Sequence, residues 1–431
     1  MTNLRARSDR RYVRSAHRSE RFVLVELEAP PAPRQTQRDP VNLAFVLDRS
    51  GSMSGDKLAL AKQAIETAVD RLLPSDRFAI VCYDDRIDVV VESTAASREA
   101  KTNAIDRLRA IDARGSTDLG GGWLRGAEQV ALSMASSGVR RTLVLTDGLA
   151  NVGIVDPQEL ARHARELRSR GVTTTTFGVG ADFDEALLQS MADAGGGHFY
   201  FIENAAQIQD HIATEVGELL QVVARDVALE ITAPDSVVVT TLSPYQLEQR
   251  GSRLRVLIGD LVAEQRLEVA LRVKFGYGPI GQDVGLLVGV SDREGVLGTA
   301  AAATAASGTG AAQPVSVRWE FADDRTNDAQ PRDRLVDRAV AKLFAARARQ
   351  HAVQLNRHGN LQGAAGGVRA VAERIAAYAG SDPVLQGLVA ELRAEDARWS
   401  APMPEMTRKA LHASASYALR SRAPSGGANR A

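Results

Sequence analysis

The sequence predicts an α/β fold, a doubly wound and mostly parallel sheet, inserted in a β-sandwich domain and followed by a helical C-terminal region. Three observations lead to this prediction. Short apolar runs alternate with longer amphipathic stretches over residues 40–222, two-residue alternation follows up to 321, and helical periodicity begins at 332. Strands alternating with helices are typical of a parallel sheet covered on both faces, whereas successive short strands are typical of a sandwich.

In the α/β region, each short apolar run is predicted to form a strand. The predicted strands are 43–48, 78–84, 87–92, 141–147, 173–180 and 198–203. The predicted helices are 57–73, 97–111, 119–136, 157–170, 184–194 and 206–222. Because only two residues separate 78–84 from 87–92, we expect these strands to form a hairpin, which makes one edge strand antiparallel.

The β-sandwich is predicted to be discontinuous in sequence. Residues 22–27 have the same alternating character as the later runs and are expected to join their sheet. The later strands are expected at 226–232, 236–242, 253–259, 266–275, 284–290 and 315–321. The predicted division is a flexible arm at 1–21, a β-sandwich at 22–32 plus 223–321, an α/β domain at 40–222, a helical region at 332–420 and a disordered tail at 421–431. In the helical region, helices are expected at 334–354, 361–378 and 383–399.

Composition limits the classes of function. The chain has 431 residues, with 53 Lys plus Arg and 53 Asp plus Glu, so its formal charge is +0. We therefore expect no nucleic-acid partner, since such proteins are usually basic. Cys82 is the only cysteine and lies in an apolar run, which favours an inert buried thiol. The polar N-terminus and the lack of any run of about 20 apolar residues predict a cytoplasmic protein without a membrane span.

Three polar fragments carry the chemistry. Asp48-Arg-Ser50-Gly-Ser52 and Asp147 each stand at the end of an apolar run, and Thr117 lies on a glycine-flanked loop. In open α/β sheets, ligands bind beyond the carboxyl ends of the strands, so we expect these fragments to converge there. The set offers oxygen ligands only, which predicts a hard cation, Mg²⁺ first, with Ca²⁺ or Mn²⁺ as alternatives.

The predicted ligand set has more hydroxyls than carboxylates. Three neutral hydroxyls and two carboxylates would leave a divalent cation short of negative charge and of ligands. A protein partner that supplies an Asp or Glu could complete the coordination sphere.

These fragments resemble the von Willebrand factor type A domain and its metal-ion-dependent adhesion site, over about residues 40–222. Asp48, Ser50 and Ser52 match the Asp-x-Ser-x-Ser motif of that family, Thr117 its threonine and Asp147 its strand-end aspartate. The resemblance implies that the hydroxyls bind the metal directly and that the acids often act through water. It also implies a Rossmann-like sheet with one antiparallel edge strand. The wider layout is similar to bacterial A-domain proteins related to calcium-activated chloride channel accessory proteins and inter-alpha-trypsin inhibitor heavy chains.

Other residues have two interpretations. The acidic cluster of Asp84, Asp85 and Asp88 could hold a second cation, but a solvated hairpin tip is favoured, because Asp is common in turns. Trp123 could border the metal face or belong to the core. We interpret His198 as an ordinary histidine at a strand end.

The leading hypothesis is a non-enzymatic, metal-dependent protein-binding module. A second hypothesis is that helix 206–222 shifts on ligand capture. The alternatives are an adaptor subunit of an ATPase or metal-chelatase-like machine, since A-type domains recur in such assemblies, and a Mg²⁺-dependent phosphoryl-transfer enzyme. The enzyme is disfavoured because the sequence has neither a nucleotide-binding loop nor a positioned base. The identity of the partner and the oligomeric state stay open.

Overall fold

The computed structural model describes the chain except residues 1–2, 33–37, 133–137, 299–311, 421 and 424–431. The chain forms two compact units. One is Pro33–Val222, the α/β unit, and the other combines Met1–Ala32 with Val223–Ala431 and is called the β unit here. The α/β unit is thus inserted in the sequence of the β unit, as the predicted fold class requires.

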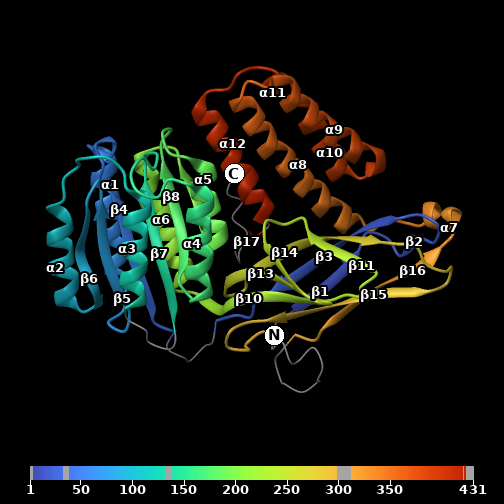
Figure 1. The fold of residues 1–431 in the computed structure, drawn as a ribbon, viewed down its shortest axis with the longest axis horizontal. Helices are drawn as coiled ribbons and strands as arrows, with labels where there is room; N and C mark the ends of the chain where they lie inside the picture. Colours follow the sequence, from blue (N-terminus) through green and yellow to red (C-terminus); the bar gives the residue numbers. More distant parts are fainter. Residues whose placement is uncertain (1–2, 33–37, 133–137, 299–311, 421, 424–431) are drawn as a thin grey trace. The chain divides into compact units, whose positions relative to one another are not determined.

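The α/β unit is built on a six-stranded sheet with the order β6-β5-β4-β7-β8-β9 (Figure 1). Its strands are β4 (Val41–Asp48), β5 (Arg77–Tyr83), β6 (Ile87–Ala95), β7 (Val139–Thr146), β8 (Thr173–Val179) and β9 (Gly196–Ile202). All neighbours pair in parallel except β5 and β6, which confirms the predicted antiparallel hairpin at the edge.

Helices cover both faces of this sheet. They are α1 (Asp56–Asp70), α2 (Arg98–Arg109), α3 (Leu119–Ala131), α4 (Pro157–Ser169), α5 (Glu185–Gly195) and α6 (Ile208–Leu219). Successive residues of β4 point to opposite faces: Phe45 packs in the core under α1, α2 and α6, and Val46 in the core under α3, α4 and α5. This two-sided burial explains why the parallel strands read as continuous apolar runs.

Glycines let α3 lie close to the sheet. A Cβ on Gly122 would come within 2.4 Å of the Tyr83 ring, and one on Gly126 within 2.3 Å of the Val46 side chain. These two residues are four apart and therefore share one face of the helix. This close packing fixes the start of α3 near the strand ends.

The β unit contains two sheets around one core. One has the order β1-β3-β14-β11 with β17 beside β14, and the other the order β12-β13-β10-β15-β16-β2. The strands of the first are β1 (Asn3–Ser8), β3 (Ser19–Glu28), β11 (Val237–Thr241), β14 (Arg266–Phe275) and β17 (Arg422–Ala423). Those of the second are β2 (Tyr12–Arg14), β10 (Val222–Thr232), β12 (Gln246–Arg250), β13 (Arg253–Val262), β15 (Asp283–Ser291) and β16 (Val315–Ala322). The pairing of β3 with β14, from Glu28 opposite Arg266 to Ser19 opposite Phe275, confirms that the early strand joins the later sheet.

The predicted flexible arm is wrong for the described part of residues 1–21. β1 and β2 place Leu4 and Val13 in the sandwich core, and Asp9 is buried and accepts a hydrogen bond from the Phe22 amide at 2.9 Å. The alternation in β1 is short and its outward positions are arginines, which gave the segment the composition of a solvated arm. Arg7 of β1 pairs with Glu26 at 3.5 Å instead, and Arg14 of β2 pairs with Asp324 at 2.6 Å.

The helical region belongs to the β unit. Its helices are α7 (Asp324–Ala329), α8 (Arg334–Arg357), α9 (Leu361–Ala379), α10 (Pro383–Ala394), α11 (Asp396–Trp399) and α12 (Glu405–Arg420). Val336 of α8 and Leu419 of α12 pack with Leu24 and Ala270 of the β3–β14 sheet. α7 and α12 were not predicted, and the single helix expected at 383–399 is two helices. Of the predicted disordered tail, 421 and 424–431 lie outside the described residues, while residues 422–423 form β17.

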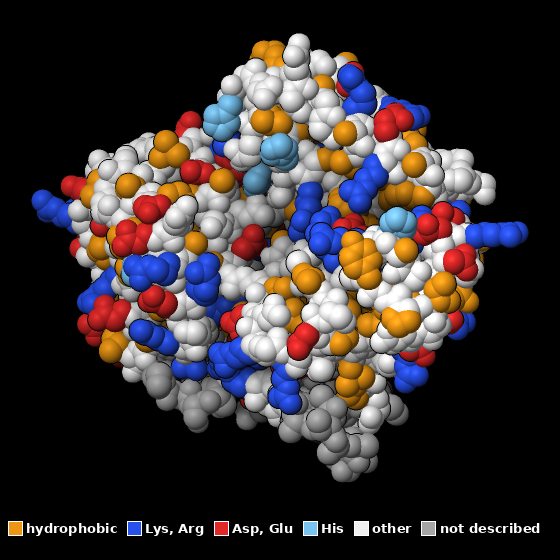
Figure 2. Space-filling model, turned by 45° about the vertical axis from the view of Figure 1, so that its right-hand side comes forward, with side chains coloured by type: hydrophobic (Ala, Val, Ile, Leu, Met, Phe, Trp, Pro, Cys, Tyr) orange, Lys and Arg blue, Asp and Glu red, His pale blue; other side chains and the backbone are white. Residues whose placement is uncertain are grey.

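Two surface properties bear on function. Lys and Arg side chains share the face drawn in Figure 2 with Asp and Glu, in keeping with the balanced composition. No helix among the described residues combines the length and the apolar character needed to cross a bilayer.

Candidate metal centre

Two neighbouring strands bring the predicted carboxylates to one edge of the α/β sheet. Asp48 is the last residue of β4, and Asp147 directly follows β7. The strands pair in parallel, with Leu47 opposite Leu145, so their carboxyl ends meet. Both aspartates are fully buried. Buried carboxylates require compensation by donors or by a cation.

Asp48 accepts two hydrogen bonds from its own surroundings. One oxygen accepts from the Ser50 amide at 2.8 Å, and the other from the Thr146 hydroxyl at 2.6 Å. Burial raises the pKa of Asp48 to about 6, and the charge of Asp147 adds to the rise, although the bonds from Thr146 and Ser50 act in the opposite direction. The ionised carboxylate is therefore costly where it stands, and a cation beside it would remove that cost.

The serine hydroxyls connect the two strand ends. Ser50 Oγ and Ser52 Oγ lie 3.2 Å apart, and Ser52 Oγ donates to Asp147 Oδ1 at 2.6 Å. A short 3-10 helix, Gly51–Met53, carries this turn, and the Gly51 amide donates to the carbonyl of Gly115 at 3.1 Å. The turn is thereby attached to the loop that contains the predicted threonine.

Thr117 lies on that loop, and its hydroxyl faces the same side of Gly148 as the Ser52 hydroxyl. A Cβ on Gly148 would lie 3.4 Å from Thr117 Oγ1 and 3.8 Å from Ser52 Oγ, so both hydroxyls converge on Gly148. Asn151 holds the loop. Its side-chain Oδ1 accepts from the Thr117 backbone amide at 3.0 Å, and its backbone amide donates to the Thr117 carbonyl at 3.2 Å. The structure thus brings all five predicted side chains to one site.

Sequence reasoning missed two residues at this site. These residues, Asn151 and Lys57, are not among the predicted ligands. Lys57, in the first turn of α1, places Nζ 2.5 Å from Asp147 Oδ2. The only available signal was a basic residue five positions after Ser52.

The oxygen donors fit a hard divalent cation. Two carboxylates and three hydroxyls converge without sulfur or imidazole, which is the chemistry preferred by Mg²⁺, Ca²⁺ or Mn²⁺. The buried, high-pKa carboxylate of Asp48 is the part of the set that most requires a counter-charge.

The acidic cluster on the hairpin differs from its prediction. Asp84 is fully buried and accepts from Arg49 Nε at 3.1 Å and from Arg114 Nε at 2.7 Å. Burial raises the pKa of Asp84, but the bonds from Arg114, Arg49 and the backbone outweigh it and hold the pKa below its usual value. The favoured solvated tip is therefore wrong for Asp84, whereas Asp85 and Asp88 are exposed. The two guanidinium groups already supply the counter-charge that a second cation would bring.

Another buried carboxylate, that of Glu215, lies between α6 and the sheet. Glu215 accepts from Arg141 at 2.7 Å, Thr175 at 2.7 Å and Tyr200 at 2.8 Å, and it lies 2.9 Å from His198 Nδ1. His198 and Glu215, with the neighbouring Glu218, could geometrically hold a metal, but the Arg141 guanidinium, 2.7 Å from Glu215, already supplies this carboxylate with a counter-charge. His198 is thus a partner of a buried acid rather than an ordinary histidine.

Trp123 belongs to the core. Its side chain is fully buried, and its Nε1 donates to Thr174 Oγ1 at 3.1 Å. It does not border the metal face, so the core interpretation is confirmed.

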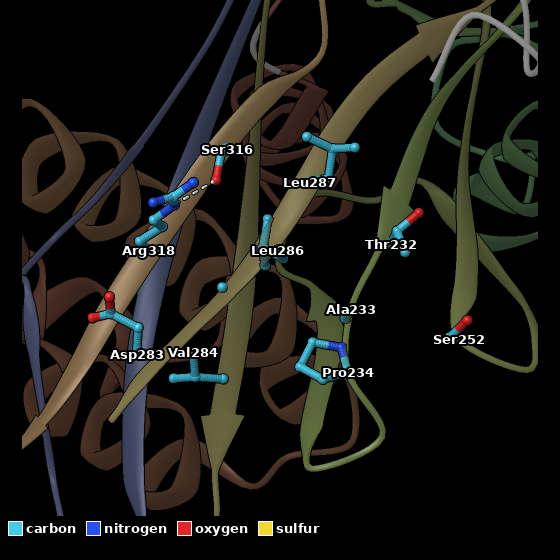
Figure 3. Close-up of a pocket in the computed structure, with 11 residues that line it drawn as sticks. Thr232, Ala233, Pro234, Ser252, Asp283, Val284, Leu286, Leu287, Ser316 and Arg318 are labelled. Carbon is cyan, nitrogen blue, oxygen red and sulfur yellow. Dashed lines mark hydrogen bonds between the residues drawn. The ribbon is translucent and has the colours of Figure 1, made fainter. Parts of the chain in front are cut away.

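The β unit has a shallow groove of about 540 Å³ (Figure 3). Strand β15 contributes apolar residues such as Leu287, and β16 contributes Arg318, whose Nε donates to Ser316 Oγ at 3.3 Å. Asp283 is the one carboxylate among its lining residues. The groove lacks the converging oxygen donors of the α/β unit, so we do not take it as the candidate site.

The fold and the site together define a class of protein. Residues 42–214 match the model of the von Willebrand factor type A domain, so the chain contains a domain of this class. The uncharacterized protein YfbK of Escherichia coli (strain K12) is 33% identical over 216 residues, which is 49% of this chain and 37% of YfbK. Human inter-alpha-trypsin inhibitor heavy chain H4 is 28% identical, over 53% of this chain and 25% of its own. The chain thus spans well under half the length of these two relatives.

Solved structures share the fold over nearly the whole chain. The von Willebrand factor type A structure from Catenulispora acidiphila has a TM-score of 0.69 at 20% identity and covers 92% of this chain and 96% of its own. The ArnB paralog VWA2 from Sulfolobus acidocaldarius has a TM-score of 0.58 at 16% identity and covers 97% and 99%. At such identities the likeness concerns the fold alone.

Proposed function

We propose that the α/β unit is a non-enzymatic module that binds a protein partner through a divalent cation. The proposed ligands are Asp48, Ser50, Ser52, Thr117 and Asp147. The proposed cation is Mg²⁺, with Ca²⁺ or Mn²⁺ as alternatives. The observation that carries the proposal is the convergence of five oxygen-bearing side chains around a buried carboxylate with a raised pKa.

In this proposal the partner supplies a missing oxygen ligand. Two carboxylates balance a divalent cation formally, but hydroxyls are neutral and weak donors, so an open position favours a stronger oxygen ligand. An Asp or Glu side chain of the partner meets that requirement. When bound, the cation would supply the electrostatic attraction, while Ser50, Ser52 and Thr117 would orient it at the edge of the sheet.

The surroundings of the site favour a protein as the partner. Three apolar residues in the loop that follows Asp147 are exposed to solvent. The exposed fraction is 56% for Leu149, 37% for Val152 and 49% for Val155. The Val152 amide donates to the Thr117 carbonyl at 3.3 Å, so this apolar loop lies directly beside the candidate ligands. Exposed apolar residues around a charged centre are typical of protein interfaces, in which burying them adds to affinity.

Calorimetric titration of the full chain with MgCl₂ tests the metal site. The wild type is expected to bind Mg²⁺, and Asp48→Ala to weaken binding by about tenfold or more, as loss of a metal ligand typically does. Asp85→Ala is the matched control, because Asp85 is exposed on the neighbouring hairpin. Equal Mg²⁺ binding by Asp48→Ala and the wild type would overturn the proposed site.

Partner capture tests the second half of the proposal. Protein retained from a cell extract on the immobilised chain in Mg²⁺ is expected to elute with EDTA and to be missing on the Asp48→Ala variant. Retention that survives EDTA would contradict a metal-bridged contact. We propose the cytoplasm as the location of this interaction, which cell fractionation would check.

A further inference from the structure

We propose that Lys57 is a built-in counter-charge of the candidate metal centre, which weakens its affinity for the cation and strengthens the affinity of the loaded centre for a carboxylate. This inference rests on the proposed function and concerns the regulation of the same site. Its consequence is a centre that releases its metal more easily but attracts an acidic partner more strongly.

The geometry places the Lys57 ammonium against Asp147, one of the two proposed carboxylate ligands. Its Nζ lies 2.5 Å from Asp147 Oδ2 and 3.5 Å from the Ser52 carbonyl oxygen. The other carboxylate oxygen of Asp147 accepts from Ser52 Oγ at 2.6 Å. Both oxygens of Asp147 are therefore engaged within the protein. Asp147 is fully buried, whereas the Lys57 side chain is 30% exposed, so the ammonium approaches this aspartate from the solvent side.

The start of α1 fixes this position. Gly55 precedes the helix with φ of 79°, a backbone conformation that residues with a side chain rarely adopt, and Lys57 follows in the first helical turn. Gly180, directly after β8, is a neighbour of the lysine: a Cβ there would be in ordinary van der Waals contact with Nζ, at 3.9 Å. The ammonium is thus held at the strand ends by the path of the chain.

Counting charges shows what the lysine does. Two aspartates and one ammonium give the centre a formal charge of −1 without metal and +1 with a divalent cation. Without Lys57 the corresponding values would be −2 and 0. A nearby positive charge disfavours cation binding and favours an anion, and both effects are stronger at a partly buried site than in water. The same residue should therefore shift the two affinities in opposite directions.

An ordinary structural ion pair would behave differently. If Lys57 only kept Asp147 in place, its removal would loosen the centre, and the affinities for metal and carboxylate would both fall. A counter-charge instead predicts changes of opposite sign in the two affinities, so measuring both separates the two roles. Neither measurement requires the natural partner.

The experiment uses the full chain and two probes. Titration calorimetry with MgCl₂ measures metal affinity. Water proton relaxation of the Mn²⁺-loaded protein during titration with acetate measures carboxylate affinity, since acetate that displaces a metal-bound water lowers the relaxation rate. Lys57→Met is expected to bind Mg²⁺ about tenfold more tightly and to need about tenfold more acetate for half-saturation, equivalent to about 1.4 kcal/mol in each direction.

Three further variants complete the test. Lys57→Gln removes the same charge with a polar side chain and replaces Lys57→Met if that variant does not fold. Lys57→Arg keeps the charge and should resemble the wild type. Lys62→Met is the matched control: Lys62 is also on α1, but its Nζ bonds the Ile111 and Arg109 carbonyls at 2.6 and 3.0 Å.

The outcomes distinguish this inference from the proposed function. If Asp48→Ala loses Mg²⁺ while Lys57→Met and Lys57→Gln keep wild-type affinities, the metal site stands and the role of Lys57 is overturned. Weaker Mg²⁺ binding by both lysine variants would likewise overturn it. If Asp48→Ala binds Mg²⁺ as the wild type does, the proposed function itself fails.

Discussion

Asp48 shows how one buried side chain couples stability, pH and metal. Its pKa is raised to about 6, above the value of about 3.9 expected in the unfolded chain. The folded state then holds the proton more tightly than the unfolded state. Without metal, the contribution of Asp48 to the free energy of unfolding should therefore fall as the pH rises from about 4 to about 6, by roughly 3 kcal/mol.

This linkage predicts that protons and Mg²⁺ compete. Mg²⁺ should raise the free energy of unfolding more at about pH 7 than at about pH 5, because the carboxylate is mostly protonated at the lower pH. Urea denaturation with and without MgCl₂ measures this. Asp48→Asn should remove the difference and Asp85→Asn should not. Equal protection at both pH values would contradict the assignment of Asp48 as a ligand.

A side chain at position 148 is expected to interfere sterically with the same metal centre. A methyl group at this position would make ordinary van der Waals contact with Thr117 Oγ1 at 3.4 Å and Ser52 Oγ at 3.8 Å. Gly148→Ala should therefore fold with a change of less than about 1 kcal/mol but bind Mg²⁺ at least about tenfold more weakly, since the methyl takes space between the ligands. Calorimetry and thermal unfolding on one sample measure both effects. A variant with wild-type Mg²⁺ affinity would show that the hydroxyls do not share a cation there.

The individual site residues differ in how well the sequence predicts them. Asp48 and Asp147 could be placed because each ends an apolar run, and strand ends converge in a parallel sheet. Lys57 and Asn151 could not, because their contacts with Asp147 and Thr117 depend on side-chain directions at the start of a helix and in a loop, which no periodicity encodes.

At the scale of elements, α6 is joined to the sheet by a charged contact. Glu215 of α6 meets Arg141 of β7, Thr175 of β8 and two residues of β9. Burial raises the pKa of Glu215, but His198, Arg141 and Thr175 outweigh it and hold the pKa well below its usual value. The predicted shift of this helix on ligand capture would have to break or carry this cluster.

Glu215→Gln is expected to destabilise the α/β unit by about 3 kcal/mol at neutral pH, because Arg141 would stay buried without its counter-charge. The carboxylate contributes stability above its unfolded pKa of about 4.3, and that contribution is lost as the pH falls through its lower folded pKa. The variant should therefore lose less stability than the wild type on acidification. Chemical denaturation as a function of pH measures this, and an exposed acid on the same helix, Asp210→Asn, is the control. Parallel pH profiles would contradict the assignment.

Elements with strong periodicity were predictable and polar ones were not. β4 and β7 are apolar on both faces and appear where expected, whereas β12 (Gln246–Arg250) has no buried residue to reveal it. β1 exposes arginines, and α12 buries Lys409 and His412 among small residues. In such elements tertiary contacts decide the burial, and composition conceals it.

At the scale of the whole molecule, two compact units with separate cores predict two unfolding transitions. Mg²⁺ should raise the temperature of only one of them, because ligand binding stabilises the unit that holds the site. Differential scanning calorimetry of the full chain measures this. Asp48→Ala should abolish the shift without moving the other transition. A single transition, shifted as a whole, would show that the units unfold together.

The pairing of β3 with β14 also has a consequence for synthesis on the ribosome. Glu28 lies opposite Arg266, which is 238 positions later in the chain. At about 5–20 residues per second, the emerging strand waits roughly 10–50 s for its neighbour. The intervening α/β unit holds all its own strands and can fold during that interval. β1 can pair with one edge of β3 at once, but the edge that later pairs with β14 stays open for more than half of translation, when a chaperone would be most useful to it.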